Sequence, residues 1–216
     1  MALKYDLIVR AVASEVQPIA DKHALFLNRL DGLAEPWGVV EHCPAPDPGR
    51  ELVAIINWAR IFGGGKGIGG DITYQFRHKF RDEAFHDDKI MLSFDPKRID
   101  YGDLIDTAFP RYVAAFDGYF AEITDQGFSA DDWDGLPEDF DARHNLYRLP
   151  PVCFMRADFC ERALNQSARE IAARLDGQVA LVREMLDGVL VVLTYEILPT
   201  VEMGRLCWEK KALLTV

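Results

Sequence analysis

The residues with the most evident capacity for chemistry lie between Asp117 and Asp141, where nine acidic residues occur without a single Lys, Arg or His. The acids are Asp117, Glu122, Asp125, Asp131, Asp132, Asp134, Glu138, Asp139 and Asp141. Carboxylates concentrated in one place attract cationic groups and raise the association rate more than the affinity. The same stretch holds Phe128, Trp133 and Phe140, which a purely solvating segment would lack. This combination indicates a surface that meets a basic partner.

The acidity of the chain is local. The 216 residues include 35 acids and 24 bases, a net charge of −11, and removal of this acidic stretch leaves 26 acids against 24 bases, a net charge of −2. A cationic face, which general nucleic-acid binding requires, is therefore not expected, and we predict no nucleic-acid partner. The hydrophobic fraction of 49% is ordinary for a globular protein.

Two interpretations of the acidic stretch remain open. It is either a solvated loop whose aromatic side chains pack back onto the core, or a binding surface with Trp133 as its anchor. In the second case its carboxylates pair with Arg or Lys of the partner. We assign the partner-binding residues under this hypothesis to Asp131, Asp132, Trp133, Asp134, Glu138 and Asp139.

The glycine run Gly63–Gly70 invites a nucleotide-binding interpretation. A P-loop has Ser or Thr directly after its Lys and a helix next, whereas Lys66 is followed by Gly67 and then by an expected strand. The run is either a connector or a backbone nest for an anion. Lys66, Arg77, Lys79 and Arg81 form a basic cluster that is either a solvated sheet face or a contact for acidic groups. The alternative function is thus an enzyme of unrecognised type that binds a phosphate-bearing ligand at Gly63–Gly70.

Other reactive side chains lack a recognisable pattern. His86, Asp87 and Asp88 are three possible metal ligands in succession, but adjacent residues rarely converge on one ion, so we expect no metal and no cofactor. His23 falls on the apolar face of an expected helix and is predicted to be packed. Four cysteines, Cys43, Cys153, Cys160 and Cys207, contain no C-x-x-C and are expected to be buried thiols in a reducing compartment. We predict no catalytic residues.

Elements of the N-terminal part follow from hydrophobic periodicity. The patterns predict strands over 3–13, 37–43, 72–80 and 89–94, and helices over 16–30, 51–62 and 103–123. The alternation of Ile72, Tyr74 and Phe76 with polar residues is the clearest strand pattern, and 89–94 is its expected antiparallel neighbour. Pro110 should kink or break the helix over 103–123.

The C-terminal part carries stronger local patterns. Pro151–Met155 is an expected strand, Asp158 is expected to cap a short helix, and Ser167-Ala-Arg-Glu170 is a capping-box sequence. Val179–Leu186 and Val189–Tyr195 flank Asp187-Gly188, which is typical of a type I′ hairpin turn. Thr200 is expected to cap a final helix over 201–213.

These elements predict an α+β fold, a mainly antiparallel sheet with helices packed on it. We expect a single domain over 1–216. Two loosely similar βαββα halves, 1–123 and 147–216, joined by an acidic loop over 124–146, are a further possibility.

The C-terminal motifs Leu149-Pro-Pro-Val-Cys-Phe154, Ser167-Ala-Arg-Glu170 and Leu186-Asp-Gly-Val-Leu190 resemble immunity proteins of bacterial polymorphic-toxin and secretion-effector systems. The resemblance implies a non-catalytic cytoplasmic protein that neutralises one cognate toxin by direct binding, and it transfers no interface residues. The N-terminus does not read as a signal peptide, and no apolar run reaches the roughly 18 residues of a membrane span. We therefore expect a cytoplasmic toxin inhibitor with no membrane contact. A subunit of a larger assembly is a third hypothesis, and the oligomeric state stays open.

Overall fold

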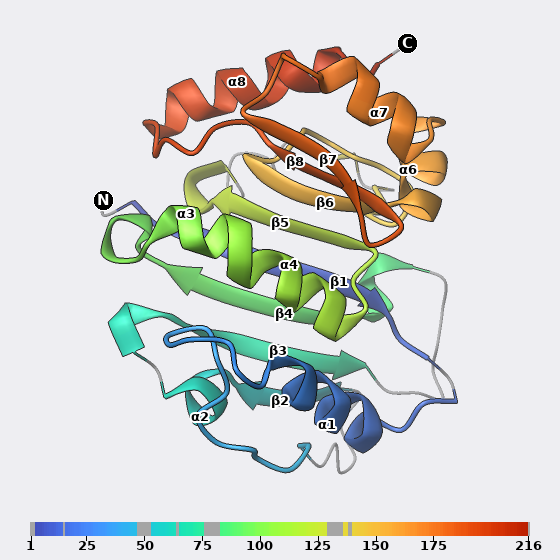
Figure 1. Cartoon of the computed structure of the whole chain (residues 1–216). Coiled ribbons are helices and arrows are strands. Elements are labelled where there is room, and N and C mark those ends of the chain that lie inside the picture. Colours follow the sequence, from blue (N-terminus) through green and yellow to red (C-terminus); the bar gives the residue numbers. More distant parts are fainter. Residues whose placement is uncertain are drawn as a thin grey trace.

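The described residues form one antiparallel sheet of eight strands with helices packed against it (Figure 1). The computed structural model describes residues 3–14, 16–46, 53–63, 65–75, 83–128, 136–137 and 140–215. The strand order is β2-β3-β4-β1-β5-β6-β8-β7, so strands from both ends of the chain hydrogen-bond within the same sheet. The predicted α+β class is confirmed.

The strand order places the N-terminal strand, β1, near the centre of the sheet. The strands are β1 Tyr5–Val12, β2 Val53–Asn57, β3 Gly69–Gln75, β4 Asp87–Phe94, β5 Phe120–Asp125, β6 Val152–Arg156, β7 Leu181–Met185 and β8 Gly188–Val192. The α-helices are α1 Ile19–Leu30, α2 Ala59–Phe62, α3 Tyr101–Asp103, α4 Phe109–Phe116, α6 Ala157–Leu164, α7 Ala168–Leu175 and α8 Thr200–Ala212. Short 3-10 turns cover Gly65–Gly67, Ala84–His86 and Pro96–Arg98.

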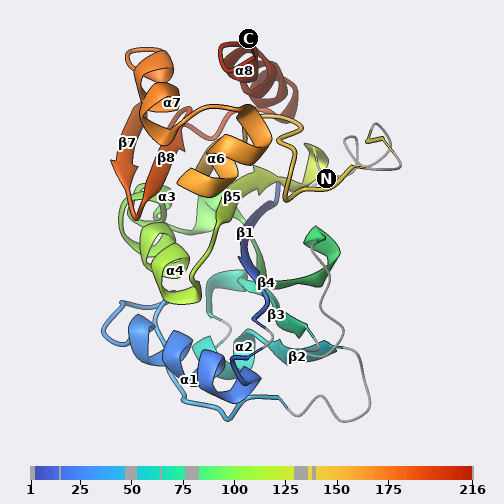
Figure 2. The same cartoon turned by 90° about the vertical axis from the view of Figure 1, so that its right-hand side faces the viewer.

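Alternation along β1 divides the sheet into two faces. Tyr5, Leu7 and Val9 are fully buried on the face that packs against α1 and α4, which Figure 2 shows on one side of the strands. The second face is buried by α6, α7 and α8 over the C-terminal strands β6 and β8 and over Phe120 of β5. Over β3, β4 and β1 no α-helix of the described residues covers this second face. We call this uncovered part the open face.

Two predictions in the first half of the chain are wrong. Trp37–Cys43 forms turns instead of a strand, with Trp37 buried and its carbonyl accepting a hydrogen bond from Tyr112 (2.8 Å). The expected helix over 51–62 is β2 followed by the short α2. The run Val53–Ile56 satisfies helical spacing, but it pairs in register with β3 and buries Ala54 and Ile56. Asn57 then accepts a hydrogen bond from the Ala59 amide (3.0 Å), which starts α2.

The expected helix over 103–123 ends earlier than predicted. It runs from Tyr101 to Phe116, ends at Asp117 in the left-handed region (φ 59°), and the chain then enters β5. The break predicted at Pro110 corresponds to a π-helical turn over Leu104–Ala108 directly before α4, in which Pro110 occupies the first turn. Proline lacks the amide that a continuous α-helix would need there.

In the C-terminal part the capping box and the hairpin are confirmed, and the two predictions of single capping residues are wrong. Asp158 does not cap α6, whose N-cap is Arg156; its carboxylate instead accepts hydrogen bonds from Arg156 and Arg162. Ser167 and Glu170 form the predicted capping box of α7. The hairpin turn is centred on Leu186 and Asp187, which both have positive φ, one residue before the predicted dipeptide. Thr200 donates to Asp125 (2.7 Å) and makes no cap of α8. None of the described helices is long and apolar enough to cross a membrane.

Candidate binding groove

The open face forms the floor of a groove. Two adjoining cavities of about 670 and 310 Å³ lie over it. They share five lining residues, Arg10, Lys89, Leu136, Phe140 and Ala142. The floor therefore comes from the central strands β1 and β4, and one wall comes from the described parts of the acidic stretch and the residues after it.

Four residues that are directly paired across neighbouring strands form a row on the floor of the groove. Lys89 of β4 lies opposite Thr73 of β3 and opposite Arg10 of β1, and Arg10 in turn lies opposite Phe120 of β5. These four residues point to the same face because directly paired residues in antiparallel strands do so. The row places two cationic side chains next to each other in the middle of a sheet.

Asp87 is the carboxylate that acts electrostatically on both Arg10 and Lys89. Within the described ranges, neither side chain makes an ion pair or a hydrogen bond. Burial lowers the pKa of Lys89 below its usual 10.5, and the positive charge of Arg10 lowers it further, while Asp87 acts in the opposite direction. Both side chains are half-buried. Their charge is thus held in a partly desolvated place, where it acts strongly on an anion.

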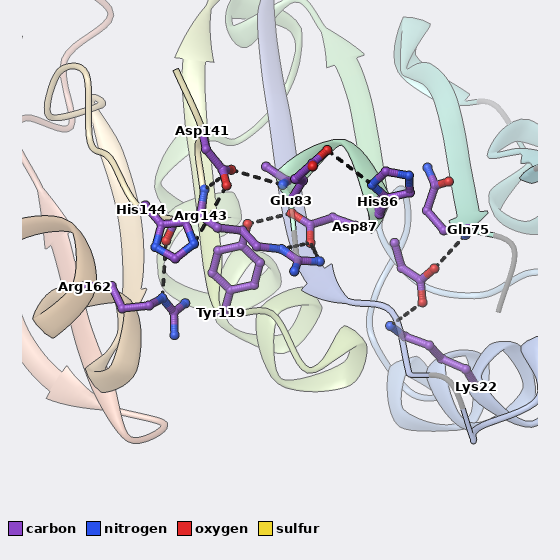
Figure 3. A network of polar contacts seen from close by, with 12 residues as sticks. Lys22, Gln75, Glu83, His86, Asp87, Tyr119, Asp141, Arg143, His144 and Arg162 are labelled. Carbon is purple, nitrogen blue, oxygen red and sulfur yellow. Dashed lines mark hydrogen bonds and ion pairs between the residues drawn. The ribbon is translucent and has the colours of Figure 1, made fainter. Parts of the chain in front are cut away.

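Asp87 lies on the same face, and both of its carboxylate oxygens already have partners (Figure 3). Its Oδ1 accepts from Arg143 Nε (2.8 Å) and pairs with Nη2 (2.7 Å), and its Oδ2 accepts from the Tyr119 hydroxyl (2.6 Å). Burial raises the pKa of Asp87, and the bonds from Tyr119 and Arg143 oppose that rise. Asp87 and Arg143 are 2% exposed, so this is a structural ion pair beside the groove.

Asp88 points to the opposite face of the sheet. Its Oδ2 pairs with Lys22 of α1 (2.7 Å) and its Oδ1 accepts from the Gln75 amide (2.8 Å). Two consecutive carboxylates therefore serve different faces, in agreement with the prediction that they do not converge on one ion. His86 Nδ1 lies 3.9 Å from Glu83. In the described part of the chain no group of three or more His, Cys, Asp or Glu could hold a metal ion.

Two described residues of the acidic stretch, Phe128 and Asp141, are fixed to the body of the protein. On one side Phe128 is 4% exposed and lies beneath the Arg148 guanidinium, 4.1 Å from the ring centroid. On the other side Asp141 Oδ1 accepts from the amides of Ala84 (3.0 Å) and Arg143 (2.9 Å). The expectation that aromatic side chains of this stretch pack on the core holds for Phe128.

The residues assigned to partner binding are Asp131, Asp132, Trp133, Asp134, Glu138 and Asp139, and all of them lie outside the described residues. The same applies to the predicted basic residues Arg77, Lys79 and Arg81, and to the side chain of Lys66. Nearby, the described aromatic residues form a row: Phe140 contacts Tyr147 (ring centroids 6.1 Å apart), which contacts Trp208 of α8 (5.1 Å). Trp208 is 46% exposed.

The glycine run has structural reasons for its composition. Gly63 ends α2 in the left-handed region (φ 74°), and Gly70 (φ 142°) lies so close to β4 that a Cβ would overlap the Met91 carbonyl oxygen. A helix precedes the run and a strand follows it, which is the reverse of a dinucleotide-binding turn.

Three of the four cysteines are buried, and His23 is held by hydrogen bonds, so none of these four side chains is suited to act as a nucleophile or a base. Cys153, Cys160 and Cys207 are buried, and burial raises the pKa of Cys160 to about 12 and that of Cys153 well above its usual value. His23 bonds to the Tyr74 hydroxyl (2.8 Å) and the Cys43 carbonyl (3.2 Å), and burial lowers its pKa. The prediction that His23 is packed is confirmed.

Sequence reasoning missed Arg10 and Lys89. Each was assigned to a strand, but β1 was not paired with β4, so the two charges were not brought together. A register alignment of residues 5–12 against 87–94 would have shown them, since Arg10 and Lys89 then fall opposite each other. No protein-family model, curated protein or solved structure matches the chain.

Proposed function

We propose that the chain is a non-catalytic cytoplasmic binding protein that neutralises a cognate toxin or effector protein by direct contact. Its acidic stretch faces a basic surface of that partner, and Asp131, Asp132, Trp133, Asp134, Glu138 and Asp139 supply the contacts. The proposal combines the local charge with the resemblance to immunity proteins of polymorphic-toxin systems.

The observation that carries the proposal is the attachment of Phe128 and Asp141, within the acidic stretch, to the body of the protein. Phe128 and Arg148 are in contact and are 4% and 7% exposed, so these two residues are fixed beside each other. Asp141 adds a second attachment to Ala84. Because these flanking residues are fixed to the body of the protein, less ordering entropy is lost when a partner binds beside them.

The state of the buried carboxylates favours binding over catalysis. Asp87 and Asp88 are used in ion pairs with Arg143 and Lys22. Asp125 accepts from Thr200 (2.7 Å) and from the Gly127 amide (2.8 Å). Acid–base chemistry needs carboxylates whose protons can be exchanged with a substrate, and these carboxylates instead stabilise the fold.

The aromatic row beside the stretch supports the same function. Tyr147 contacts both Phe140 and Trp208. Large aromatic side chains near a charged rim are typical of the residues that dominate binding energy. The surface that we propose therefore has aromatic anchors as well as carboxylates.

The test uses the protein encoded by the gene adjacent to that of this chain as the probe. Its affinity for the wild type is compared with that for the triple variant Asp131→Lys, Asp132→Lys, Asp134→Lys by calorimetry at low and high salt. We expect an affinity loss of at least about 100-fold, since close charge pairs at interfaces couple by about 1.5–7 kcal/mol each. We also expect the salt dependence of association to weaken.

The matched control reverses three exposed acids around α1, Asp21, Glu35 and Glu41, to Lys. It changes the net charge by the same amount and should leave affinity within about threefold, because surface charges away from an interface act only through screened long-range attraction. Equal losses in both triple variants would contradict an interface at the acidic stretch. Absence of binding by the wild type would contradict the inhibitor role.

A further inference from the structure

We propose that the groove over the open face binds a small anionic molecule, a carboxylate or phosphate monoester joined to an apolar or aromatic body, through Arg10 and Lys89. The cationic floor of this site lies on β1 and β4, outside the acidic stretch, which supplies only apolar wall residues. The site needs no protein partner, so it goes beyond the proposed function.

The first argument is the position of the two cations. Arg10 and Lys89 are direct cross-strand neighbours, and like charges directly opposite each other destabilise a sheet. An anion bound between them would remove this repulsion. The pair thus lowers the stability of the sheet locally, and a binding function explains why such a pair is present.

The second argument is that the carboxylates around the pair are committed elsewhere or lie one row away. Asp87 is bound by Arg143 and Tyr119. Asp6 Oδ1 accepts from Ser93 (2.6 Å) and Gln126 (2.8 Å). Glu122, which lines the smaller cavity, lies opposite Ile8, the residue two before Arg10 on β1. The larger cavity therefore holds both cations and one carboxylate, that of Asp87, which is already paired with Arg143, whereas Asp6 and Glu122 line the smaller cavity.

The third argument is the remaining lining of the larger cavity. Thr73 lies directly opposite Lys89, so its hydroxyl is in the same row as the two cations, and Gln75 also lines the cavity. Leu136, Pro137 and Phe140 line it with apolar groups, and Phe85 at its edge is 82% exposed. A few convergent polar groups beside apolar walls are typical of small-molecule sites.

Size sets the class of ligand. The cavity of about 670 Å³ lies within the range of roughly 300–1,000 Å³ that small-molecule sites occupy. A bare inorganic anion would leave the apolar walls unused. An anion with an aromatic or aliphatic part uses both the basic floor and the walls, and the planar guanidinium of Arg10 matches the geometry of a carboxylate or phosphate.

The experiment titrates the full chain with phenyl phosphate and with benzoate by calorimetry. Benzyl alcohol serves as the neutral probe and benzylamine as the cationic probe. We expect at least one anionic probe to bind at least tenfold more tightly than either of the other two. The tighter of the two anions identifies whether the site prefers phosphate or carboxylate.

The variants Arg10→Met and Lys89→Met test the residues. Each should weaken binding of the anionic probe at least tenfold, and without ligand each should melt at a temperature equal to or above that of the wild type, because the repulsion is gone. This second readout separates loss of the site from loss of the fold. The matched controls Lys97→Met and Arg205→Met remove exposed cations outside the groove and should leave binding unchanged.

Three results would overturn the inference. The first is equal binding of anionic, neutral and cationic probes, and the second is preferential binding of benzylamine, which would point to the carboxylates of the smaller cavity. The third is anion binding that survives both Arg10→Met and Lys89→Met.

Discussion

Asp87 and Asp88 are consecutive residues of β4, and their carboxylates are bound on opposite faces of the sheet, Asp87 by Arg143 and Asp88 by Lys22. Each pair ties a distant segment to the central strands: Lys22 comes from α1, and Arg143 follows the acidic stretch. A single dipeptide thereby fixes both the helical layer on one face and the wall of the groove on the other.

The Lys22–Asp88 pair should behave as a buried ion pair in a mutant cycle. Its side chains are 8% and 0% exposed. Lys22→Met alone leaves a buried carboxylate without its cation and should lower the free energy of unfolding by about 3 kcal/mol. The double variant Lys22→Met, Asp88→Asn should recover part of that loss, since no uncompensated charge remains. Urea unfolding followed by circular dichroism measures each step.

The control for this cycle is an exposed pair. Arg98 lies 3.7 Å from Asp95, with side chains 70% and 33% exposed. Arg98→Met should change the free energy of unfolding by less than about 1 kcal/mol. A similar small effect of Lys22→Met would show that the buried pair does not stabilise the fold.

Local sequence patterns predicted the parts of the fold that depend on neighbouring residues. The capping box of Ser167 and Glu170 and the alternation around Ile72 need only contacts within one element or one strand pair, and both were predicted. The helix expected over 51–62 failed for a non-local reason. Val53–Ile56 pairs with β3, and tertiary pairing outweighed the helical spacing.

The candidate groove could not be predicted in the same way. Arg10 and Lys89 become neighbours only through the pairing of β1 with β4, which the chain makes across α1, β2 and β3. Each charge in isolation is ordinary for a half-exposed strand. The acidic stretch, by contrast, was visible from composition alone, because its charge density needs no contact to be recognised.

The β7–β8 turn carries strain that substitution should relieve. Leu186 has φ of 49° and is 45% exposed, so it gains little from burial and adopts a backbone region that bulky residues disfavour. Leu186→Asn should raise the free energy of unfolding by about 1 kcal/mol. Thermal unfolding tests this, and a fall in stability would show that the Leu186 side chain makes a contribution larger than its strain.

Gly188, two residues after Leu186, should not tolerate a side chain. An added Cβ would overlap the Met155 carbonyl oxygen and lie 2.7 Å from the Arg156 Cα. Both are backbone atoms of β6, which pairs with β8 here. Gly188→Ala should lower the free energy of unfolding by about 2 kcal/mol or more, in the range of severe overpacking. Gly177→Ala, where a Cβ would meet nothing within 4 Å, is the control and carries only the cost of its positive φ.

The four thiols should differ sharply in reactivity. Cys43 is half-buried, whereas Cys153, Cys160 and Cys207 are buried. Thiolates react and protonated thiols do not, so burial and a raised pKa protect Cys153 and Cys160. A disulfide exchange reagent should therefore modify Cys43 alone in the native protein and all four cysteines in denaturant. Rapid native modification that persists in Cys43→Ser would contradict this assignment.

The lowered pKa of Lys89 gives the groove a signature in the pH dependence of stability. Below the ordinary pKa of 10.5, Lys89 loses its proton in the folded state at a lower pH than in the unfolded state. The unfolded state therefore binds more protons in that window, and the Lys89 contribution to stability rises with pH. Comparison with Lys89→Met removes the titration of the tyrosines, which both proteins share. As the pH rises toward 10.5, the free energy of unfolding of the wild type should rise relative to that of the variant, as measured by urea unfolding. If the free energies of unfolding of the two proteins instead vary with pH in parallel, Arg10 and burial do not lower the pKa of Lys89. The repulsion between Arg10 and Lys89, on which the proposed anion site depends, would then be contradicted.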